Sequence, residues 1–290
     1  MKPNEFHFTQ ELRSLSNRLW QAEVACSGNS AAKGERLGEV ERCWDEVSQR
    51  KPSQSTEDDQ RIADVLTMLR RKNVLGQGKT CLDVGCGRGV FAIPFAQNGM
   101  TVDCFDLSQG MLEDTARKLA ALGQLSPRLI KGDWQNADLH ELQGQYHLVF
   151  SSLNPAVTSP ETIDRMTACS REWCMYLYSA GGWLSDVYGE LDEALLGKTP
   201  ETSGFNEICF PFNHLYCHGY QPIVDYTASA WDNIMTPQEA VELLEERYCK
   251  HMELEKLHRK LISDYVASHS ASGKFVHHIV WKLGMVMWHV

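Results

Sequence analysis

The N-terminal part of the chain carries apolar residues at helical spacing in an otherwise polar sequence. Their spacing is near the period of one helix face, and they are Leu12, Leu15, Leu19, Trp20 and Val24. A loose Ser-Gly-Asn-Ser break follows at 27–30. Residues 1–55 are therefore predicted to form a helical N-terminal extension that caps the rest of the molecule.

Residues 56–182 show a different pattern, in which short apolar runs alternate with helical stretches. A first helix is predicted from the capping-box-like Ser55-Thr56-Glu57-Asp58 to about Asn73. The candidate strands that follow are 80–84, 101–106, 128–131, 147–152 and 174–179. Helices are expected between them over 90–98, after an N-cap at Ser108, and after Ser159-Pro160. This alternation predicts an α/β fold with a mostly parallel sheet and helices on both faces.

The C-terminal part departs from this alternation. Residues 183–222 are rich in aromatic residues, Gly and Pro and are predicted to be an insertion or lid. A strand is expected over 223–231, then a long helix or broken helix pair from Thr236-Pro237-Gln238-Glu239 to about Ser268. An apolar strand over 274–290 ends the chain, so 223–290 is expected to complete the sheet with strands and helix.

A glycine-rich loop, Leu82-Asp83-Val84-Gly85-Cys86-Gly87-Arg88-Gly89, lies between the first predicted strand and its helix. Glycines permit a tight turn and close approach of a ligand, and a helix N-terminus offers N–H groups to an anionic group. A dinucleotide-binding oxidoreductase is the first alternative. Against it, Val90 occupies the third glycine position of that motif, and Asp83 would repel a pyrophosphate. An acid at Asp83 instead suits a nucleotide-like ligand with a positively charged amino group.

Two further acids follow predicted strands. Asp106 ends the second strand about 20 residues past the loop, the distance at which a carboxylate reaches ribose hydroxyls. Asp133, in Gly132-Asp133-Trp134, follows the third strand. Each acid alone is more simply a solvated loop residue. Together, in order and at strand ends, where open α/β sheets bind ligands, they predict a binding site.

With these motifs, residues 60 to about 180 resemble class I S-adenosylmethionine-dependent methyltransferases, specifically the small-molecule branch. The resemblance implies a Rossmann-like fold, S-adenosylmethionine as cofactor and S-adenosylhomocysteine as product. It implies that the glycines contact the methionine part of the cofactor, that acids hold its amino, ribose and adenine groups, and that a serine faces the sulfonium. The residues at the matching positions are Gly85, Gly87 and Gly89; Asp83 (amino group); Asp106 (ribose); Leu107, Met111, Asp133 and Trp134 (adenine); and Ser151 (sulfonium).

Two features depart from the family pattern. The family often has an acid at the start of the fourth strand, where this chain reads Gln145-Tyr146-His147-Leu148. The last two strands usually form a close antiparallel hairpin, whereas here the helical stretch 236–268 is expected to separate them. The C-terminal third is therefore expected to be rearranged or elaborated.

Two segments are candidates for contacting the acceptor. The first, Ser152-Leu153-Asn154-Pro155, partly resembles a motif of amino-group methyltransferases that act on nucleic acids, but it lacks the second Pro and the aromatic residue. Asn154 is a candidate for orienting a small acceptor, and a plain Asn-Pro turn is the alternative. The second, 210–220, is rich in aromatic, His and Cys residues. In it His214 is the candidate general base, with a packed helix of satisfied histidines as the alternative.

The composition of the chain limits the kinds of partner and ligand that are expected. The net charge of -10, from 28 Lys+Arg against 38 Asp+Glu, disfavours a nucleic-acid partner. The ten cysteines are interpreted as reduced thiols, and no metal site is predicted because their spacings do not suit zinc. Without a leader or an apolar run of about 18 residues, the protein is expected to be cytoplasmic with no membrane partner.

The sequence thus predicts an enzyme that transfers a methyl group from S-adenosylmethionine to a small-molecule acceptor by in-line displacement. Trp20, Trp44 and the N-terminal helices are expected to cover the cofactor mouth, with a structural cap or an oligomer contact as alternatives. A noncatalytic cofactor-binding or regulatory protein is the rival from a different class, and an NAD-dependent oxidoreductase is the third possibility. An open pocket above Ser151 to Asn154 would favour the enzyme. The oligomeric state is not predicted.

Overall fold

A mixed sheet of eight strands forms the centre of the computed structural model, which describes residues 10–26, 37–49, 60–123, 127–197, 208–249 and 252–290. The strand order is β3-β2-β1-β4-β5-β8-β6, and the short β7 pairs with β8. β3, β2, β1, β4 and β5 run parallel, and β8 is antiparallel to both β5 and β6. The strands are β1 (Thr80–Val84), β2 (Thr101–Asp106), β3 (Leu129–Lys131), β4 (Tyr146–Ser152), β5 (Ser170–Ser185), β6 (Ile223–Met235), β7 (Ser270–Ala271) and β8 (Lys274–His289). The predicted α/β class with a mostly parallel sheet is confirmed.

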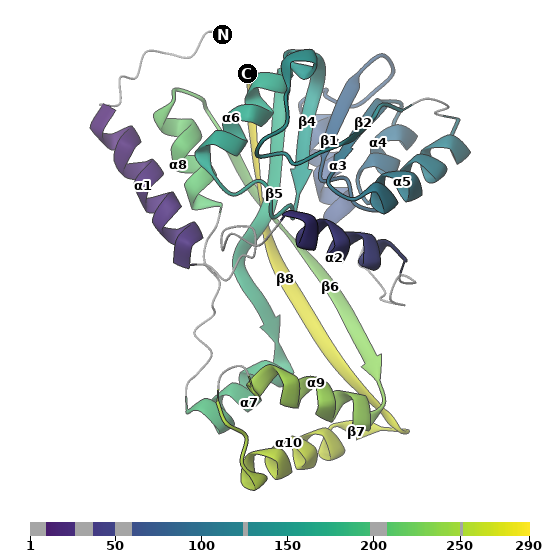
Figure 1. Cartoon of the computed structure of the whole chain (residues 1–290), viewed down its shortest axis with the longest axis vertical. Coiled ribbons are helices and arrows are strands. Elements are labelled where there is room, and N and C mark those ends of the chain that lie inside the picture. The colour runs from purple at the N-terminus through teal and green to yellow at the C-terminus, as the bar shows by residue number, and fades with distance from the viewer. Residues whose placement is uncertain (1–9, 27–36, 50–59, 124–126, 198–207, 250–251) are drawn as a thin grey trace.

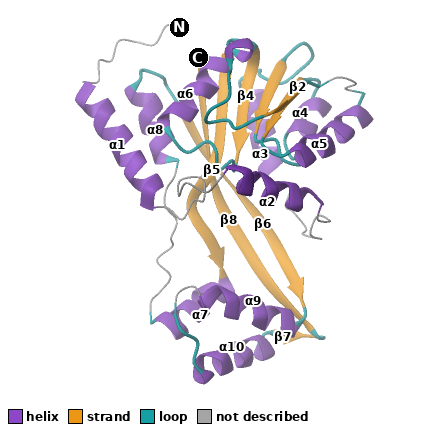
Figure 2. Ribbon diagram, in the orientation of Figure 1, coloured by secondary structure: helices purple, strands orange, loops and turns teal. Residues whose placement is uncertain are grey.

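Helices cover both faces of the parallel part of the sheet (Figure 1, Figure 2). On one face, α3 (Gln60–Arg71), α4 (Ala92–Gln97) and α5 (Gln109–Ala121) bury apolar residues against the strands. On the other face, α6 (Pro160–Cys169), α8 (Cys209–Cys217) and Trp20 of α1 (Gln10–Cys26) form a second core. α2 (Leu37–Gln49) lies across the carboxyl ends of the strands.

The helix starts follow local capping chemistry. Ser108 accepts a hydrogen bond from the Met111 N–H and begins α5, and Ser159 begins α6 in a capping box with Thr162. Each side chain satisfies a backbone donor that a helix N-terminus leaves unpaired. Both N-caps were predicted and are confirmed. The start predicted at 55–58 lies outside the described residues.

Three long strands extend beyond the carboxyl ends of the others and carry a separate group of helices (Figure 1). β5, β6 and β8 form this extension, and at its far end lie α7 (Asp186–Leu196), α9 (Pro237–Cys249) and α10 (Lys256–Ser268). These helices have an apolar core of their own, centred on residues such as Leu191, Leu244, Ile262 and Phe275. We call α7, α9, α10 and β7 the distal module.

The helical stretch between the last two long strands does not separate them in the sheet, contrary to the prediction. β6 and β8 pair from Ile223 with Met287 to Met235 with Phe275. They remain neighbours because α9 and α10 pack side by side and return the chain to the tip of the hairpin. The expected elaboration is therefore an extended hairpin that carries helices at its end.

The segment predicted as a single insertion or lid over 183–222 is divided between two places. α7 belongs to the distal module, whereas α8 packs against α1 and α6. Within the described residues, no helix is long and apolar enough to cross a lipid bilayer.

Candidate cofactor and acceptor site

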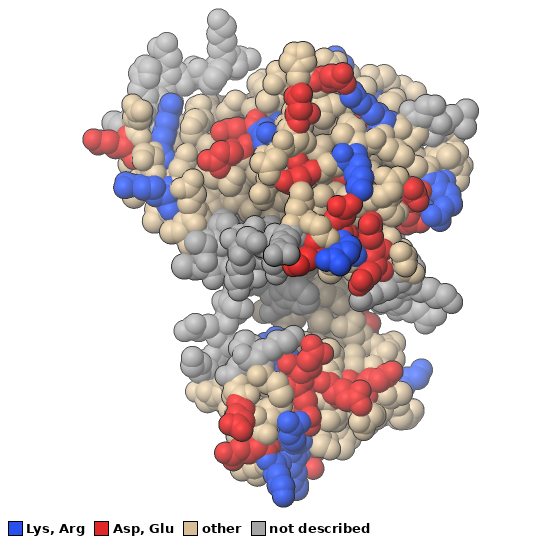
Figure 3. Space-filling model, in the orientation of Figure 1, with Lys and Arg blue, Asp and Glu red and all other residues tan. Residues whose placement is uncertain are grey.

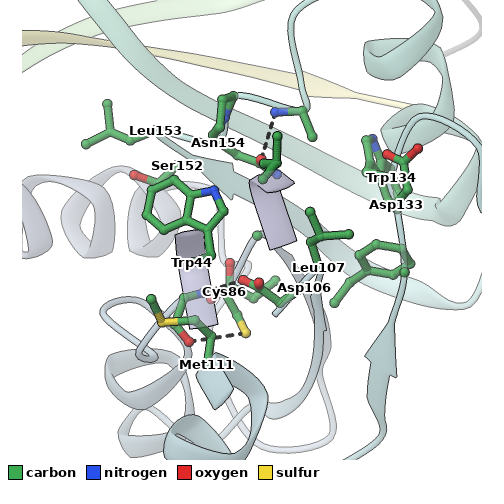
Figure 4. Close-up of a pocket in the computed structure, with 18 of the residues that line it drawn as sticks. Trp44, Cys86, Asp106, Leu107, Met111, Asp133, Trp134, Ser152, Leu153 and Asn154 are labelled. Carbon is green, nitrogen blue, oxygen red and sulfur yellow. Dashed lines mark hydrogen bonds between the residues drawn. The ribbon is translucent and has the colours of Figure 1, made fainter. Parts of the chain in front are cut away.

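A cavity of about 470 Å³ lies between the carboxyl ends of β1, β2 and β4 and the underside of α2 (Figure 4). Its wall includes the glycine loop, the end of β2, the turn at 132–136 and the turn at 152–156. α2 contributes Leu37, Val40 and Trp44, and α3 contributes Arg61. This is the edge at which open parallel sheets bind ligands.

The glycine loop folds tightly against the end of β2. Gly85 and Gly87 have φ angles of 73° and 51°, in the left-handed region that glycine enters without steric cost. The Gly85 and Cys86 N–H groups both donate to the Phe105 carbonyl oxygen, at 2.7 and 3.2 Å. At Gly85 a side chain would overlap the Asn154 side chain. The loop therefore needs glycine for its backbone angles, and at Gly85 also for space.

Asp106 connects the glycine loop to the turn after β2. Its two carboxylate oxygens accept hydrogen bonds from the Gly87 N–H at 2.8 Å and the Ser108 N–H at 2.9 Å. Burial raises the pKa of Asp106, although these backbone donors oppose the rise by favouring the charged form. Asp106 also lines the cavity, and each carboxylate oxygen retains lone-pair capacity for a ligand hydroxyl.

Asp83 lies deeper in the same cavity and is only 2% exposed. Burial raises its pKa to about 7, the nearby Asp106 carboxylate adds to the rise, and a hydrogen bond from the Ala92 backbone opposes it. An empty site therefore holds a proton on much of Asp83 near neutral pH. A cation placed beside Asp83 would favour the ionised carboxylate and release that proton.

The predicted adenine residues gather at another part of the cavity wall. Leu107, Met111, Asp133 and Trp134 all line it, and Figure 4 shows Asp133 and Trp134 together, apart from Trp44. The Asp133 carboxylate accepts hydrogen bonds from the Gln135 N–H at 3.0 Å and the Asn136 amide at 2.6 Å. The Trp134 ring is buried, and its Nε1–H donates to the Thr162 carbonyl at 3.2 Å. The buried ring of Trp134 is thus held in place by Thr162 and forms part of the cavity wall.

Ser151, which was predicted to face the sulfonium, does not line the cavity. Ser151 is fully buried, and its hydroxyl donates to the Val84 carbonyl oxygen at 2.8 Å. Ser152 lines the cavity instead. Successive residues of a strand point to opposite faces, so a shift of one position exchanges a buried residue for an exposed one.

Asn154 borders the cavity, and its side chain also holds the turn after β4. Its Nδ2 donates to the Val84 carbonyl at 3.2 Å, and its Oδ1 accepts from the Ala156 N–H at 3.0 Å. The second contact is the Asx turn expected of an Asn-Pro sequence. Leu153, just before it, has a φ of 51°, an uncommon conformation for a branched side chain. These contacts are those of the Asn-Pro turn that was the alternative for Asn154. A role of Asn154 in orienting the acceptor is a proposal.

His214 does not reach the cavity, contrary to the prediction that it acts as a general base. It is 1% exposed, and its ring nitrogens lie 3.1 Å from Asn17 Oδ1 and 2.8 Å from Asp164 Oδ1. No described residue of 210–220 lines the cavity. The chain passes through the distal module after β5, and α8 then packs on α1 and α6 instead of covering the strand ends. The alternative, a packed helix with satisfied histidines, is correct.

His214→Ala is therefore expected to act on stability and not on the cofactor. We expect a loss of about 2 kcal/mol in the free energy of unfolding, because two hydrogen bonds and a buried ring are removed. Urea denaturation measures the loss, and calorimetry should find the affinity for S-adenosylhomocysteine unchanged. His218→Ala, one turn further along α8, is the matched control with a smaller expected loss because His218 is only partly buried. A selective loss of cofactor affinity in His214→Ala would contradict the structural role.

Two helices contribute residues to the cavity wall, and of these residues only Trp44 was expected there. Leu37, Val40 and Trp44 stand at i, i+3 and i+7 of α2, and this spacing was the available signal. Arg61, near the start of α3, has its guanidinium carbon 5.4 Å from the centre of the Phe91 ring. No local signal marks Arg61 as a site residue. Trp20, by contrast, packs against Phe210 and His214 away from the cavity.

The described residues provide no group of three or more His, Cys, Asp or Glu side chains arranged to hold a metal ion.

A parallel sheet with a glycine turn, and acids at two strand ends beside one cavity, defines the class of Rossmann-like proteins that bind a nucleoside cofactor. Residues 81–174 match the family described as methyltransferase domain. Within these residues the chain therefore carries a methyltransferase domain, and the cofactor of this kind of domain is S-adenosylmethionine.

Similar proteins include one of Haemophilus influenzae that is uncharacterized and 56% identical over 36 residues. The match spans 12% of this chain and 13% of the length of that relative. A solved structure of a functionally unknown protein from Deinococcus radiodurans is 14% identical, covers 87% of this chain and 98% of its own, and has a TM-score of 0.49. The S-adenosylmethionine-dependent methyltransferase of Thiobacillus denitrificans, solved with S-adenosylhomocysteine, is 15% identical with coverages of 78% and 91% and a TM-score of 0.42.

Proposed function

We propose that this protein transfers the methyl group of S-adenosylmethionine to a small-molecule acceptor by in-line displacement. The observation that carries the proposal is the cavity itself, of about 470 Å³ and placed between the strand ends and α2. Cavities of roughly 300–1,000 Å³ are typical of small-molecule sites. The net charge of -10 also argues against a nucleic-acid acceptor.

The cofactor-binding roles that we propose follow the chemistry of the wall. Asp83 would pair with the amino group, Asp106 with the ribose hydroxyls, and Asp133 with the adenine amino group. Arg61 is the cation on α3 that lines the cavity, and it would suit the carboxylate of the cofactor or of the acceptor. Leu107 and Met111 supply apolar surface for the adenine.

Positioning is the main contribution that we propose for the protein at the acceptor end. A methyl group on a sulfonium has a good leaving group, so alignment of the acceptor lone pair supplies much of the catalysis. Among the described residues that line the cavity there is no histidine, lysine or tyrosine to serve as a base. Trp44, Ser152 and Leu153, seen together in Figure 4, border this end. The cavity also extends along 152–156, which supports a catalytic function over a purely regulatory one.

Binding measurements test the cofactor assignment first. S-adenosylmethionine and S-adenosylhomocysteine are expected to raise the melting temperature, and NAD is not. Asp106→Ala should weaken S-adenosylhomocysteine binding by roughly 1–3 kcal/mol, the scale for a lost hydrogen bond to a charged group. Asp138→Ala removes an exposed acid of a nearby loop and is the matched control. Equal stabilisation by NAD, or an unchanged affinity in Asp106→Ala, would contradict the assignment.

The acceptor is then sought by screening metabolites for additional stabilisation of the protein saturated with S-adenosylhomocysteine. A true acceptor should add stability according to its affinity and its concentration. Stabilisation only by nucleic acids would contradict a small-molecule acceptor.

A further inference from the structure

α2 covers the cavity without being part of the hydrophobic core. None of its residues is buried, and Trp44 is 38% exposed although it lines the cavity. Most helices of a folded domain are held by the burial of an apolar face. α2 has little of that support, so its position depends on its polar contacts.

Those polar contacts join α2 to three neighbouring segments: the end of β3, the glycine loop and the N-terminus of α5. Lys131, at the end of β3, forms an ion pair with Glu41 at 2.6 Å. The Arg88 guanidinium, in the glycine loop, donates to the Val47 carbonyl oxygen at 2.5 Å and to that of Ser48 at 3.0 Å. These two carbonyls belong to the last turn of α2, where carbonyl groups lack partners within the helix.

Asp45 makes the contact closest to the proposed ribose site. Its Oδ1 accepts hydrogen bonds from the Ser108 hydroxyl at 2.5 Å and the Gly110 N–H at 3.3 Å. These contacts lower the pKa of Asp45, and the Ser108 hydrogen bond is the largest cause. The carboxylate is therefore charged at neutral pH, and it lies at the N-terminus of α5, where negative charge is favoured.

Ser108 joins Asp45 to Asp106. The Ser108 N–H donates to Asp106 Oδ1 at 2.9 Å, while its hydroxyl donates to Asp45 and also caps α5. One residue therefore connects α2 to the carboxylate proposed to hold the ribose. Asp45 and Asp106 are therefore linked through hydrogen bonds to one residue.

Resting on the proposed cofactor site, we propose that α2 is a lid latched to the ribose-binding turn by Asp45, and that this latch sets how long the cofactor stays bound. Asp45 is a positioning residue in this scheme, since it acts on the ligand through Ser108 and through the place of α2. Opening the latch removes Leu37, Val40 and Trp44 from the cavity wall, which leaves the ligand exposed to solvent on that side.

Gly110 gives a second, independent way to disturb the latch. A Cβ at position 110 would clash with the Ser48 hydroxyl and would lie 3.1 Å from the Ser48 Cβ. Rotation of the hydroxyl alone does not remove the second contact, so the backbone of α2 at Ser48 must also shift by a few tenths of an ångström. Gly110 lies within α5, where alanine is a better helix former than glycine. Gly110→Ala should therefore keep or raise the stability of the fold while it wedges the lid.

The test compares the release rate of S-adenosylhomocysteine, measured by stopped-flow competition, in the full-length wild type and in single variants. Asp45→Ala is expected to release the ligand about tenfold faster, with a smaller change in the association rate, since affinity changes appear mostly in dissociation. Glu46→Ala, which removes the neighbouring exposed acid of α2, should release it at the wild-type rate. Gly110→Ala should also speed release, with a melting temperature equal to or above that of the wild type.

The outcomes separate the lid from the cofactor assignment. Faster release in both Asp45→Ala and Gly110→Ala, with faster amide hydrogen exchange over 37–49 in the ligand-bound state, supports the latch. Wild-type release rates in both variants, in protein that binds the ligand normally, overturn the latch and leave the cofactor site intact. Release that quickens only in proportion to a lowered melting temperature, and not in Gly110→Ala, shows a merely structural role and also overturns it. A wild type that binds no S-adenosylhomocysteine overturns the proposed function together with this inference.

Discussion

Gly85→Ala is expected to lower the free energy of unfolding by about 3 kcal/mol or more. Gly85 has a φ of 73°, where an alanine costs roughly 1–2 kcal/mol. The added Cβ would also lie 2.6 Å from Asn154 Cγ and 3.0 Å from Asn154 Cβ. The Asn154 side chain holds the Val84 carbonyl and the turn after β4, so it can move away only by giving up those hydrogen bonds. Urea denaturation measures the loss.

Gly87→Ala is the matched control for that prediction. Gly87 is also left-handed, with a φ of 51°, but nothing lies within 4 Å of its added Cβ. Its cost should be limited to the same backbone term, roughly 1–2 kcal/mol. If the two variants lost equal stability, the close packing of Gly85 on Asn154 would be disproved as the cause.

The central sheet was predictable because its strands are short, buried and bounded by turn residues. β1 and β2 have the bounds that the apolar runs indicate, and β3 and β4 differ from them by one residue at the start. β5 is different, since only 174–179 carries the apolar signal whereas the strand runs over 170–185. Its last part is a strand because it pairs with β8, about 100 residues later in the chain. The local sequence pattern of β5 does not indicate that it pairs with β8.

The residues of the cavity wall were predictable where they follow from the glycine loop and the strand ends. Asp83 and Asp106 both line the cavity, as these positions imply. The burial of Ser151 has a simple physical origin, since a strand reverses the direction of its side chains at every residue. A sequence pattern locates the end of β4 but does not decide which of two adjacent serines lines the cavity.

The environment of His214 could not be derived from its own segment. Its neighbours Asn17, Trp20 and Asp164 come from α1 and α6, up to 197 positions away in the chain. The composition of 210–220 suits the wall of a pocket and a helix packed in a core equally well. Only the path of the chain through the distal module decides between them.

The affinity for S-adenosylhomocysteine is expected to rise with pH up to about 7 and then to level off. Burial raises the pKa of Asp83 to about 7 in the empty site. The cationic amino group of the ligand binds the ionised carboxylate, so below pH 7 binding must first remove a proton. Over that range the affinity should change by up to about tenfold per pH unit, the limit for one coupled proton. Asp106, whose pKa is also raised by burial, adds to the effect in the same direction at the acid end.

The stability of the empty protein should show the opposite trend from the same cause. The folded state holds the Asp83 proton more tightly than the unfolded chain, whose ordinary value is 3.8. Between about pH 4 and pH 7 the folded state therefore binds more protons, and the contribution of Asp83 to stability falls as the pH rises. Asp83→Asn removes the titrating group and should flatten this contribution in urea denaturation series at several pH values.

Calorimetry separates the Asp83 explanation from a general effect of pH on the fold. At pH 6.5, titrations in buffers of different ionisation enthalpy should show a net release of protons on binding, and Asp83→Asn should show much less. The variant should also bind more weakly at pH 8, because a neutral amide replaces the carboxylate that pairs with the ligand amino group. Asp133→Asn is the control, since it changes another acid of the wall and should retain the proton release. A wild-type affinity that stays flat between pH 5.5 and 7 would contradict the coupling of ligand binding to loss of the Asp83 proton, which a pKa of about 7 predicts.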